Sequence, residues 1–533
     1  MIAKPSRFPA QGPVIAALSL AAGGLAAVAS PPFGFLPGLL GYGLLMRLAD
    51  VTPSKAPLRS GFWRGWLAGL AYFLVSTWWV SEAFLVDAAQ AWMAPIAVAL
   101  LAAGLGLFWG AAALLYRLLQ PRGALRVLVF AGCFCLLEWL RGHVLTGFPW
   151  DLSGETWQAG SAPSQVAALV GAYGLGWVTV AAAAAPAMLA DPGRSRRTWL
   201  AAGLSVLAVA GLYAYGANRL EHAAATPRLG APIVRVIQAR VEQADKYDEQ
   251  MFRDILQRYL TLTAQPAGRS PAVIVWPEAA IPDPANDYLA DGTWTKAAVL
   301  AALRPGQTLL AGAYRVTGTQ ERPVYYNTLL ALRDQDGDLV TTAVYDKFRL
   351  VPFGEYMPLD RLMTKIGFKA LTHTGDSFSP GPGPRSIQAP GLPRVQPLIC
   401  YESLFPGFTR AAARKDGRAG WIVNVSNDAW FGHTYGPVQD LNLASYRAIE
   451  EGLPMVRATP TGVSAVIDAY GRIAPGDRLD QGVMGLIDAP LPAALPPTPF
   501  AAHGEALFWL MIIVSSLSAA AAYRRRLTVR APN

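Results

Sequence analysis

Three residues of chemically reactive types each follow a short apolar run in the second half of the chain. Glu278 comes after "AVIVWP", Lys347 after "LVTTAVYD" and Cys400 after "VQPLI". A rigid sheet brings together side chains at its rim although they are distant in sequence. A thiolate is a strong nucleophile, a carboxylate can accept the thiol proton, and an ammonium can stabilise an oxyanion. The three residue types therefore predict acyl transfer or amide hydrolysis through a thioester.

The elements that would position these residues begin at residue 232. Short β-rich runs alternate there with turns and helical stretches, a pattern typical of an α/β domain. One helix is predicted over 247–264. Strands are predicted over 232–241, 272–280, 307–316, 327–333, 339–348, 395–403, 420–428 and 463–471.

Long apolar runs dominate the remainder of the chain. With 53% hydrophobic and 15% charged residues in 533, the composition is too apolar for a typical soluble protein. Most of eight runs are long enough to cross a bilayer, and they cover 13–29, 33–48, 65–81, 91–116, 124–140, 165–190, 198–216 and 504–523. The second run is interrupted by Pro37. A cleavable signal peptide is the alternative interpretation of the first.

Basic residues concentrate in alternate loops between these runs. One set of loops carries sixteen bases: Lys4, Arg7, Arg47, Lys55, Arg59, Arg64, Arg117, Arg122, Arg126, Arg194, Arg196, Arg197, Arg524, Arg525, Arg526 and Arg530. Cationic loops stay in the cytoplasm, which predicts eight spans with both termini cytoplasmic and residues 217–503 on the outer side. Because these loops account for the net charge of +9, no nucleic-acid partner is predicted.

The cysteines and histidines do not form a metal-binding pattern. Cys133 and Cys135 lie two residues apart on a predicted helix and so point in different directions. The five histidines have no spacing that suits a metal site. The sequence therefore predicts no metal and no other cofactor, and Cys400 remains as a lone thiol in the outer part.

Four segments around the reactive residues resemble the signatures of the nitrilase (carbon–nitrogen hydrolase) superfamily. They are "WPEAAIP", "YDKFRLVPFGEYMP", "ICYESLFP" and "NVSNDAWFG". Together with the apolar runs and "EWLRGHVLTGFPW" (138–150), they make the chain similar to the apolipoprotein N-acyltransferase family. The resemblance implies that Glu278, Lys347 and Cys400 are catalytic.

The same resemblance implies an architecture and a location. The expected fold is an integral membrane bundle of about eight helices plus an extracytoplasmic α/β nitrilase-like domain, an αββα sandwich. The expected divisions are a seven-helix bundle over 1–217, a periplasmic catalytic domain over 218–495, and a linker, final helix and basic cytoplasmic tail over 496–533. The expected location is the bacterial inner membrane.

Further site residues are implied by the resemblance. Those expected to support or bind substrate are Glu355, Tyr401, Glu402, Asn327, Asn427, Trp430, Phe431 and Tyr247. At Tyr247 the sequence departs from the family, which often has a tryptophan there. The segments 355–371 and 428–437 mix aromatic, apolar and basic residues as interfacial segments do. Trp79, Trp150 and Trp157 are expected in an aromatic belt.

The implied reaction takes an acyl chain from a phospholipid, typically phosphatidylethanolamine, and passes it to the α-amino group of a diacylglyceryl-cysteine lipoprotein. A membrane-tethered amidase or nitrilase that acts on a small amide is the alternative. A transporter or scaffold is a third hypothesis, which the intact triad and the rarity of charges within the spans disfavour.

Overall fold

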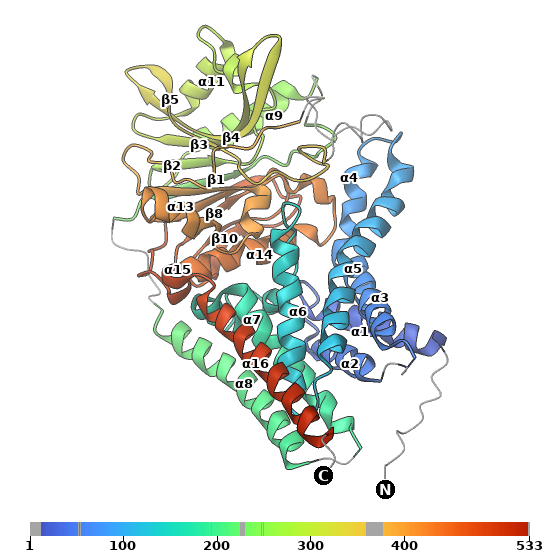
Figure 1. Ribbon diagram of the computed structural model, residues 1–533. Helices are drawn as coiled ribbons and strands as arrows, with labels where there is room; N and C mark the ends of the chain where they lie inside the picture. The colour runs from blue at the N-terminus through green and yellow to red at the C-terminus, as the bar shows by residue number, and fades with distance from the viewer. Residues whose placement is uncertain are drawn as a thin grey trace.

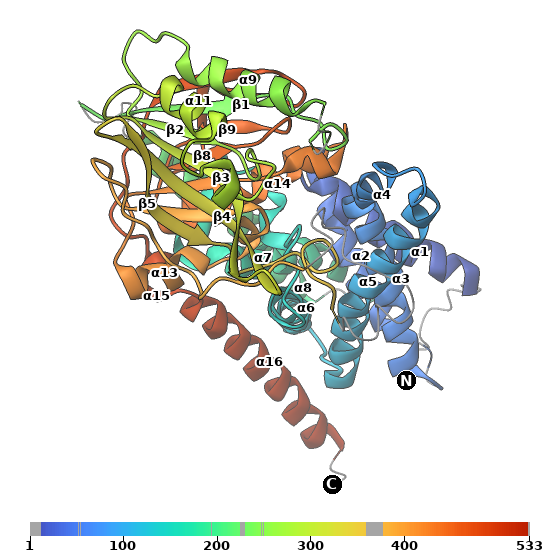
Figure 2. The ribbon, with the colours of Figure 1, turned by 90° about the horizontal axis from the view of Figure 1, so that it is seen from above.

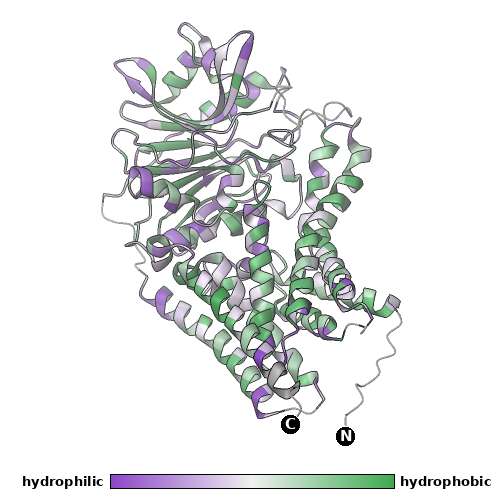
Figure 3. Ribbon diagram, viewed as in Figure 1, coloured by the Kyte–Doolittle hydropathy of each residue, from purple (hydrophilic) through white to green (hydrophobic). Residues whose placement is uncertain are grey.

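The computed structural model describes residues 12–530 apart from 52, 54, 193–194, 224–229, 247, 249 and 359–376, and gives the backbone alone for 525–530. A helical part and a sheet part are stacked on one another (Figure 1). The last helix returns to the helical part and diverges from the others when seen from above (Figure 2). Apolar residues cover the helical part, whereas polar and apolar residues mix in the sheet part (Figure 3).

Helices occupy all eight positions at which apolar runs predict spans. They are α1 (Gly12–Ala29), α2 (Leu40–Asp50), α3 (Pro57–Thr77), α5 (Ala94–Leu119), α6 (Arg126–His143), α7 (Ala167–Ala184), α8 (Arg196–Glu221) and α16 (Ala506–Arg530). Five described stretches are long and apolar enough to cross a membrane: Gly12–Ala29, Ala91–Leu119, Pro163–Ala190, Arg196–Glu221 and Ala506–Arg524. The predicted apolar helices are therefore present, and the number that cross a bilayer stays a prediction.

The continuous helix expected over 33–48 does not form. Leu36–Leu39, which contains Pro37, is a 3-10 turn, and α2 runs for only 11 residues. Proline lacks the N–H that an α-helix needs in its interior, so the regular helix begins after it. Eleven residues span about 17 Å at 1.5 Å each, short of the roughly 30 Å of a hydrocarbon core.

The helices α3 and α5 approach closely through glycine. A Cβ atom on Gly65 would lie 2.4 Å from the carbonyl oxygen of Trp109, and one on Gly69 would lie 2.8 Å from the Cα of Gly106. Small residues at such spacing let two helix backbones come together, which is the usual way that membrane helices associate without a hydrophobic driving force.

The sheet part contains two sheets. The six-stranded sheet has the order β11-β1-β2-β3-β4-β5, and the five-stranded sheet has the order β10-β9-β8-β7-β6. The strands are β1 (Ile233–Gln238), β2 (Val273–Trp276), β3 (Thr308–Thr319), β4 (Arg322–Gln335), β5 (Asp338–Asp346), β6 (Val395–Ile399), β7 (Trp421–Val425), β8 (Met455–Ala458), β9 (Ser464–Ile467), β10 (Ile473–Leu479) and β11 (Gly485–Pro490).

The two sheets pack face to face and helices cover their outer faces. Val236, Val275 and Leu310 of the larger sheet share one core with Val423 and Val456 of the smaller. The helices α9 (Phe252–Ala264) and α11 (Trp294–Ala302) cover the six-stranded sheet, and α13 (Phe408–Asp416) and α14 (Gly436–Glu451) cover the five-stranded one (Figure 1). The layers are helix, sheet, sheet, helix, so the predicted αββα sandwich is present.

The direction of the strands explains why the reactive residues meet. β1, β2 and β3 are parallel, and β5 runs in the same direction as β3 because both are antiparallel to β4. The carboxyl ends of β2 and β5 therefore lie at one edge of their sheet. Because β2 is buried, it reads as a short apolar run, and the first polar residues after it mark this edge.

Buried polar contacts join α14 to the helical part. Arg447 forms ion pairs with Glu155, at 2.9 Å, and with Glu450, at 2.8 Å. Glu450 also accepts the backbone N–H of Ala172 in α7 at 2.8 Å. Arg447 donates in addition to the carbonyl of Leu404, at 2.7 Å, four residues after the candidate nucleophile. A continuous chain of contacts thus links α7 to the segment that follows Cys400.

The predicted aromatic belt of Trp79, Trp150 and Trp157 is wrong, because all three side chains are buried. The ring of Trp79 packs 4.7 Å from Trp150 and 4.5 Å from Phe431, between centroids. These rings fill the junction between the two parts of the molecule. Phe431, expected to support or bind substrate, belongs to this junction as well.

Candidate active site

Four polar side chains form a closed cluster at the edge of the larger sheet. The Lys347 Nζ donates to Glu278 Oε1, at 3.1 Å, and to Glu355 Oε1, at 2.9 Å. The Asn327 Nδ2 donates to the same two oxygen atoms, at 2.7 Å each. The sequence analysis names all four residues, and the structure brings them together. Lys347 and Asn327 hold two carboxylates side by side that would otherwise repel each other.

The cluster fixes the protonation of its members. Burial raises the pKa of Glu278, but Lys347, the Asn327 hydrogen bond and Lys246 outweigh it, so the pKa lies below its usual 4.5. Burial lowers the pKa of Lys347, but Glu278 and Glu355 outweigh it and raise that pKa. The resting site therefore holds a carboxylate and an ammonium. An ammonium has three protons, so one N–H of Lys347 remains for a third acceptor.

Cys400 lies in a strained backbone conformation at the end of β6. Its φ is +49°, in the left-handed region that residues other than glycine rarely occupy. A short 3-10 turn, Cys400–Leu404, begins there. Burial, and then the charge of Glu278, raise the pKa of the Cys400 thiol, while Lys347 lowers it. The charges of Glu278 and Lys347 thus act on the thiol, which is protonated at rest.

Glu402 ties the turn of Cys400 to the segment of Lys347. Its Oε1 accepts from the Tyr345 hydroxyl, at 2.8 Å, and from the backbone N–H groups of Phe348, at 2.8 Å, and Arg349, at 3.2 Å. Its Oε2 accepts the N–H of Ile399 at 2.9 Å. Glu402 is completely buried. One carboxylate therefore holds the strand that ends at the thiol and the segment that follows the lysine.

Tyr401 anchors the same turn to the helical part. Its hydroxyl donates to the carbonyl of Gly147, which lies in the loop after α6. The Arg349 Nη1 donates to the neighbouring carbonyl of Thr146 at 3.1 Å. The motif 138–150 of the sequence analysis thus contacts the site directly.

A second lysine lies against the cluster and was not predicted. Lys246 is buried, and its Nζ lies 3.4 Å from the carbonyl oxygen of Glu278. Burial lowers the pKa of Lys246 to about 8, while Glu278 and Cys400 raise it. With its amide oxygen turned toward them, Asn427 accepts from Lys246, at 3.2 Å, and from the Trp430 Nε1, at 3.0 Å. Lys246 has no local sequence signal that separates it from a surface lysine.

Two predicted positions cannot be placed in this arrangement. Tyr247 lies outside the described residues, and so do residues 359–371 of the predicted interfacial segment 355–371. Among the described residues, no group of three or more His, Cys, Asp or Glu is arranged to hold a metal ion.

A buried ion-pair network underlies the turn that contains Asn427 and Trp430. Arg457 on β8 pairs with Asp428, at 2.8 Å, and with Asp440, at 2.7 Å, and all three are buried. Arg457 also donates to the Asn424 side chain, whose Nδ2 donates to the carbonyl of Leu398 at 3.0 Å. Burial raises the pKa of Asp428 to about 6, although Arg457 opposes it. The network reaches β6 two residues before Cys400.

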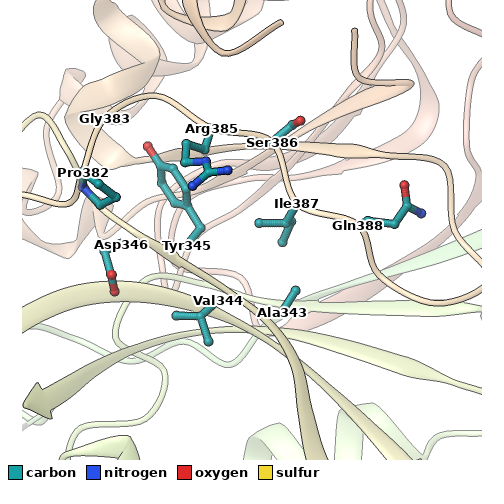
Figure 4. Close-up of a pocket in the computed structure, with 10 residues that line it drawn as sticks. All are labelled: Ala343, Val344, Tyr345, Asp346, Pro382, Gly383, Arg385, Ser386, Ile387 and Gln388. Atoms are coloured by element: carbon teal, nitrogen blue, oxygen red, sulfur yellow. The ribbon is translucent and has the colours of Figure 1, made fainter. Parts of the chain in front are cut away.

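A pocket of about 310 Å³ lies behind this edge of the larger sheet. Figure 4 shows it between the end of β5, with Tyr345 and Asp346, and the segment that contains Arg385 and Ser386. Its lining residues include none of the predicted site residues. Its wall nevertheless touches the site through Tyr345, which donates to Glu402.

The comparisons with known families match the helical part and the sheet part separately. The family model of Carbon-nitrogen hydrolase matches residues 234–495, and that of the Apolipoprotein N-acyltransferase N-terminal domain matches residues 22–185. The sandwich is thus a domain of the carbon–nitrogen hydrolase class, joined to an apolar helical part.

Relatives match over nearly the whole chain. The apolipoprotein N-acyltransferase of Caulobacter vibrioides is 55% identical over 96% of this chain and 95% of its own. The apolipoprotein N-acyltransferase of Rhodopseudomonas palustris is 37% identical over 92% of each. The chain belongs to the apolipoprotein N-acyltransferase family. An amidase structure from Nesterenkonia sp. covers 54% of this chain and 99% of its own, with 18% identity and a TM-score of 0.33.

Proposed function

We propose that this protein transfers an acyl chain from a membrane phospholipid to the α-amino group of a diacylglyceryl-cysteine lipoprotein, through a thioester on Cys400. One observation carries the proposal: a strained cysteine lies within the electrostatic reach of a buried carboxylate and ammonium, in a chain that matches N-acyltransferases over nearly its whole length. The low pKa of Glu278 and the high pKa of the thiol assign the starting protonation states.

In the first half-reaction, Glu278 takes the proton of the Cys400 thiol while the sulfur attacks the ester carbonyl of the donor. The carbonyl oxygen becomes an oxyanion, which the remaining N–H of Lys347 stabilises. When the oxyanion collapses, the C–O bond to the glycerol breaks. The leaving alkoxide takes the proton from Glu278, and a lysophospholipid departs from the acylated enzyme.

In the second half-reaction, the neutral α-amino group of the acceptor attacks the thioester carbonyl. Glu278 accepts a proton from the attacking nitrogen, and Lys347 again stabilises the oxyanion. The C–S bond then breaks and the thiolate takes the proton back from Glu278. Glu355 and Asn327 are positioning residues in this scheme, because both contact the catalytic carboxylate or ammonium and neither needs to touch the substrate.

Exposed apolar side chains near the site support a lipid substrate. Leu145, in the loop that contacts Tyr401, exposes 92% of its surface, and Phe353, two residues before Glu355, exposes 54%. Both have a positive φ. Each buried methylene contributes about 0.8 kcal/mol, so a fold that exposes such residues on the loops that contact its active-site segments suits a site at the bilayer surface.

The proposal also includes the membrane topology, the location, the donor lipid and the domain divisions that the sequence predicts. They are eight spans with both termini in the cytoplasm, a bacterial inner-membrane location with the catalytic domain in the periplasm, phosphatidylethanolamine as donor, and the divisions at residues 217 and 495. The asymmetry of basic residues between loops supports the orientation. Hydrolysis of a small amide is not favoured, because the relatives that match the helical part as well as the sandwich bear the N-acyltransferase name.

The test is to incubate the purified protein with phospholipid alone and to analyse the peptide that contains Cys400 by mass spectrometry. An adduct with the mass of one acyl chain is expected, and adding a diacylated lipopeptide should move that mass to the peptide's amino terminus. A protein that acylates the lipopeptide without ever carrying the adduct would refute the thioester. Release of free fatty acid with no acylated lipopeptide would instead indicate a hydrolase.

A further inference from the structure

A second pocket lies where the sheet part meets the last helix. Figures 1 and 2 both place α13 and α15 (Pro499–His503) at the root of α16. The pocket has a volume of about 360 Å³, in the range of small-molecule sites. Arg410 from α13, Glu505, Ala506 and Trp509 form much of its wall.

The guanidinium of Arg410 is held in place at this wall. Its Nε and Nη2 donate to the carbonyls of Ala501 and Ala502, at 3.0 and 3.1 Å. Its Nη1 lies over Gly504, so close that a Cβ there would be only 2.8 Å away. Gly504 also has a φ of +64°. Glycine is therefore required at residue 504 both for its backbone and for the space that the cation occupies.

The pocket also contains a carboxylate and borders a pair of tryptophans. The Glu505 Oε2 accepts from the Trp139 Nε1 at 2.8 Å. The ring of Trp139 lies 4.9 Å from that of Trp509. Tryptophans at the ends of membrane helices mark the level of the lipid headgroups. A fixed cation and a fixed anion thus lie at that level, which matches the two charges of a zwitterionic headgroup.

An apolar face of α16 continues from the pocket. Leu510, Ile513, Val514 and Leu517 are all exposed, and their spacing of three and four residues puts them on one side of the helix. The charged pocket and this apolar face together match the charged headgroup and the apolar acyl chains of a glycerophospholipid.

We propose that this pocket binds one zwitterionic glycerophospholipid, with its phosphate on Arg410, its ammonium near Glu505 and its acyl chains along α16. This inference goes beyond the acyl-transfer reaction and uses only the membrane placement from that proposal. The lipid is not the reacting donor, because the pocket wall includes none of the catalytic residues. Pro406, six residues after Cys400, lines the pocket. The bound lipid therefore braces the segment that follows the nucleophile.

The test uses the full-length protein with Cys400→Ala, so that no acyl chain is transferred. The probe is a phosphatidylethanolamine with a diazirine in one acyl chain, and cross-linked peptides are mapped after irradiation. Arg410→Gln removes the phosphate contact, and Ala506→Phe fills the pocket while leaving Arg410 intact. Ala520→Phe, a change of the same kind at an exposed position farther along α16, is the matched control.

Cross-links to 506–517 are expected. The yield should be about tenfold lower in Arg410→Gln, since one charge-assisted hydrogen bond is worth about that factor. It should also fall in Ala506→Phe, which blocks the pocket, and stay unchanged in Ala520→Phe. Equal yields in all variants would overturn the proposal. Equal competition by a diacylglycerol with the same chains would also overturn it, because that probe lacks the phosphate. Equal competition by inorganic phosphate at the same concentration would overturn it as well, because it would show a phosphate site without lipid recognition. The acyl adduct on Cys400 in the wild-type protein is a separate readout, so failure here leaves the proposed reaction standing.

Discussion

Substitution of Glu402 by glutamine tests how the candidate site is held together. The carboxylate accepts four hydrogen bonds: three on Oε1 and, on Oε2, the N–H of Ile399. Glutamine has one oxygen, so at least one N–H must face the new amide N–H₂. A buried N–H without a partner costs about 1–3 kcal/mol. The apparent melting temperature should fall by roughly 2–10 °C for a domain of this size.

The same change should slow the formation of the thioester. Ile399 directly precedes Cys400, and a displacement of about 1 Å at a reacting atom costs on the order of 10²-fold in rate. The assay is the rate of appearance of the acyl adduct on Cys400 with phospholipid alone. Tyr345→Phe is the matched control, because it removes one donor to Glu402 without stranding a backbone group. It should cost only about 1 kcal/mol, with a rate within roughly threefold of wild type.

The pH dependence supplies a further check on Glu402. Burial raises its pKa to about 7, from the usual 4.5. A carboxyl whose folded-state pKa is raised contributes stability below pH 4.5, and that contribution is lost as the pH rises through 7. The gap in melting temperature between wild type and Glu402→Gln should therefore be wider at pH 5.5 than at pH 8. A variant that melts and reacts like the wild type at both pH values would refute the reasoning.

Three other substitutions give distinct results. Cys400→Gly should abolish the adduct yet melt higher than Cys400→Ala, by the equivalent of about 1 kcal/mol, because glycine tolerates the positive φ; equal melting in a thermal scan would contradict this strain. Lys347→Met removes the main cause that lowers the pKa of Glu278, so burial should raise that pKa above 4.5. The acid limb of the pH profile of the adduct rate should then shift to higher pH. An unshifted limb would exclude Glu278 as the base. Arg457→Met leaves two buried aspartates unpaired and should lower the free energy of unfolding by about 3–5 kcal/mol. The loss should appear as a lower yield of folded protein in size-exclusion chromatography. Adding Asp428→Asn should recover part of that yield, and no recovery would argue against the ion pair.

Strand ends were the most predictable part of the site. Glu278 and Cys400 could be identified because each follows a buried strand, and such strands read as apolar runs whatever they pair with. Lys347 follows the edge strand β5, which is partly exposed. Lys246 and Arg457 could not be identified in this way. Their significance depends on acidic residues at least 17 positions away in sequence, and no local pattern records such pairs.

The helix α14 was not predicted from the sequence. Nearly all of it is buried, so its polar residues mark contacts with other parts of the protein and not a solvent-exposed face. The same burial explains the tryptophans. Tryptophan is a residue type that is common in interfacial belts, but the junction between the two parts of the molecule buries Trp79 and Trp150.

The sequence by itself determined the apolar helices, most strands of the sandwich and the residue types that can perform acyl transfer, because hydropathy, turn residues and nucleophilicity are local properties. The tertiary structure alone decided which charges meet. It placed Lys347 between Glu278 and Glu355, and it set Glu402 under the turn of Cys400. The protonation states on which the chemistry depends follow from these distances and from burial, and neither exists in a chain before it folds.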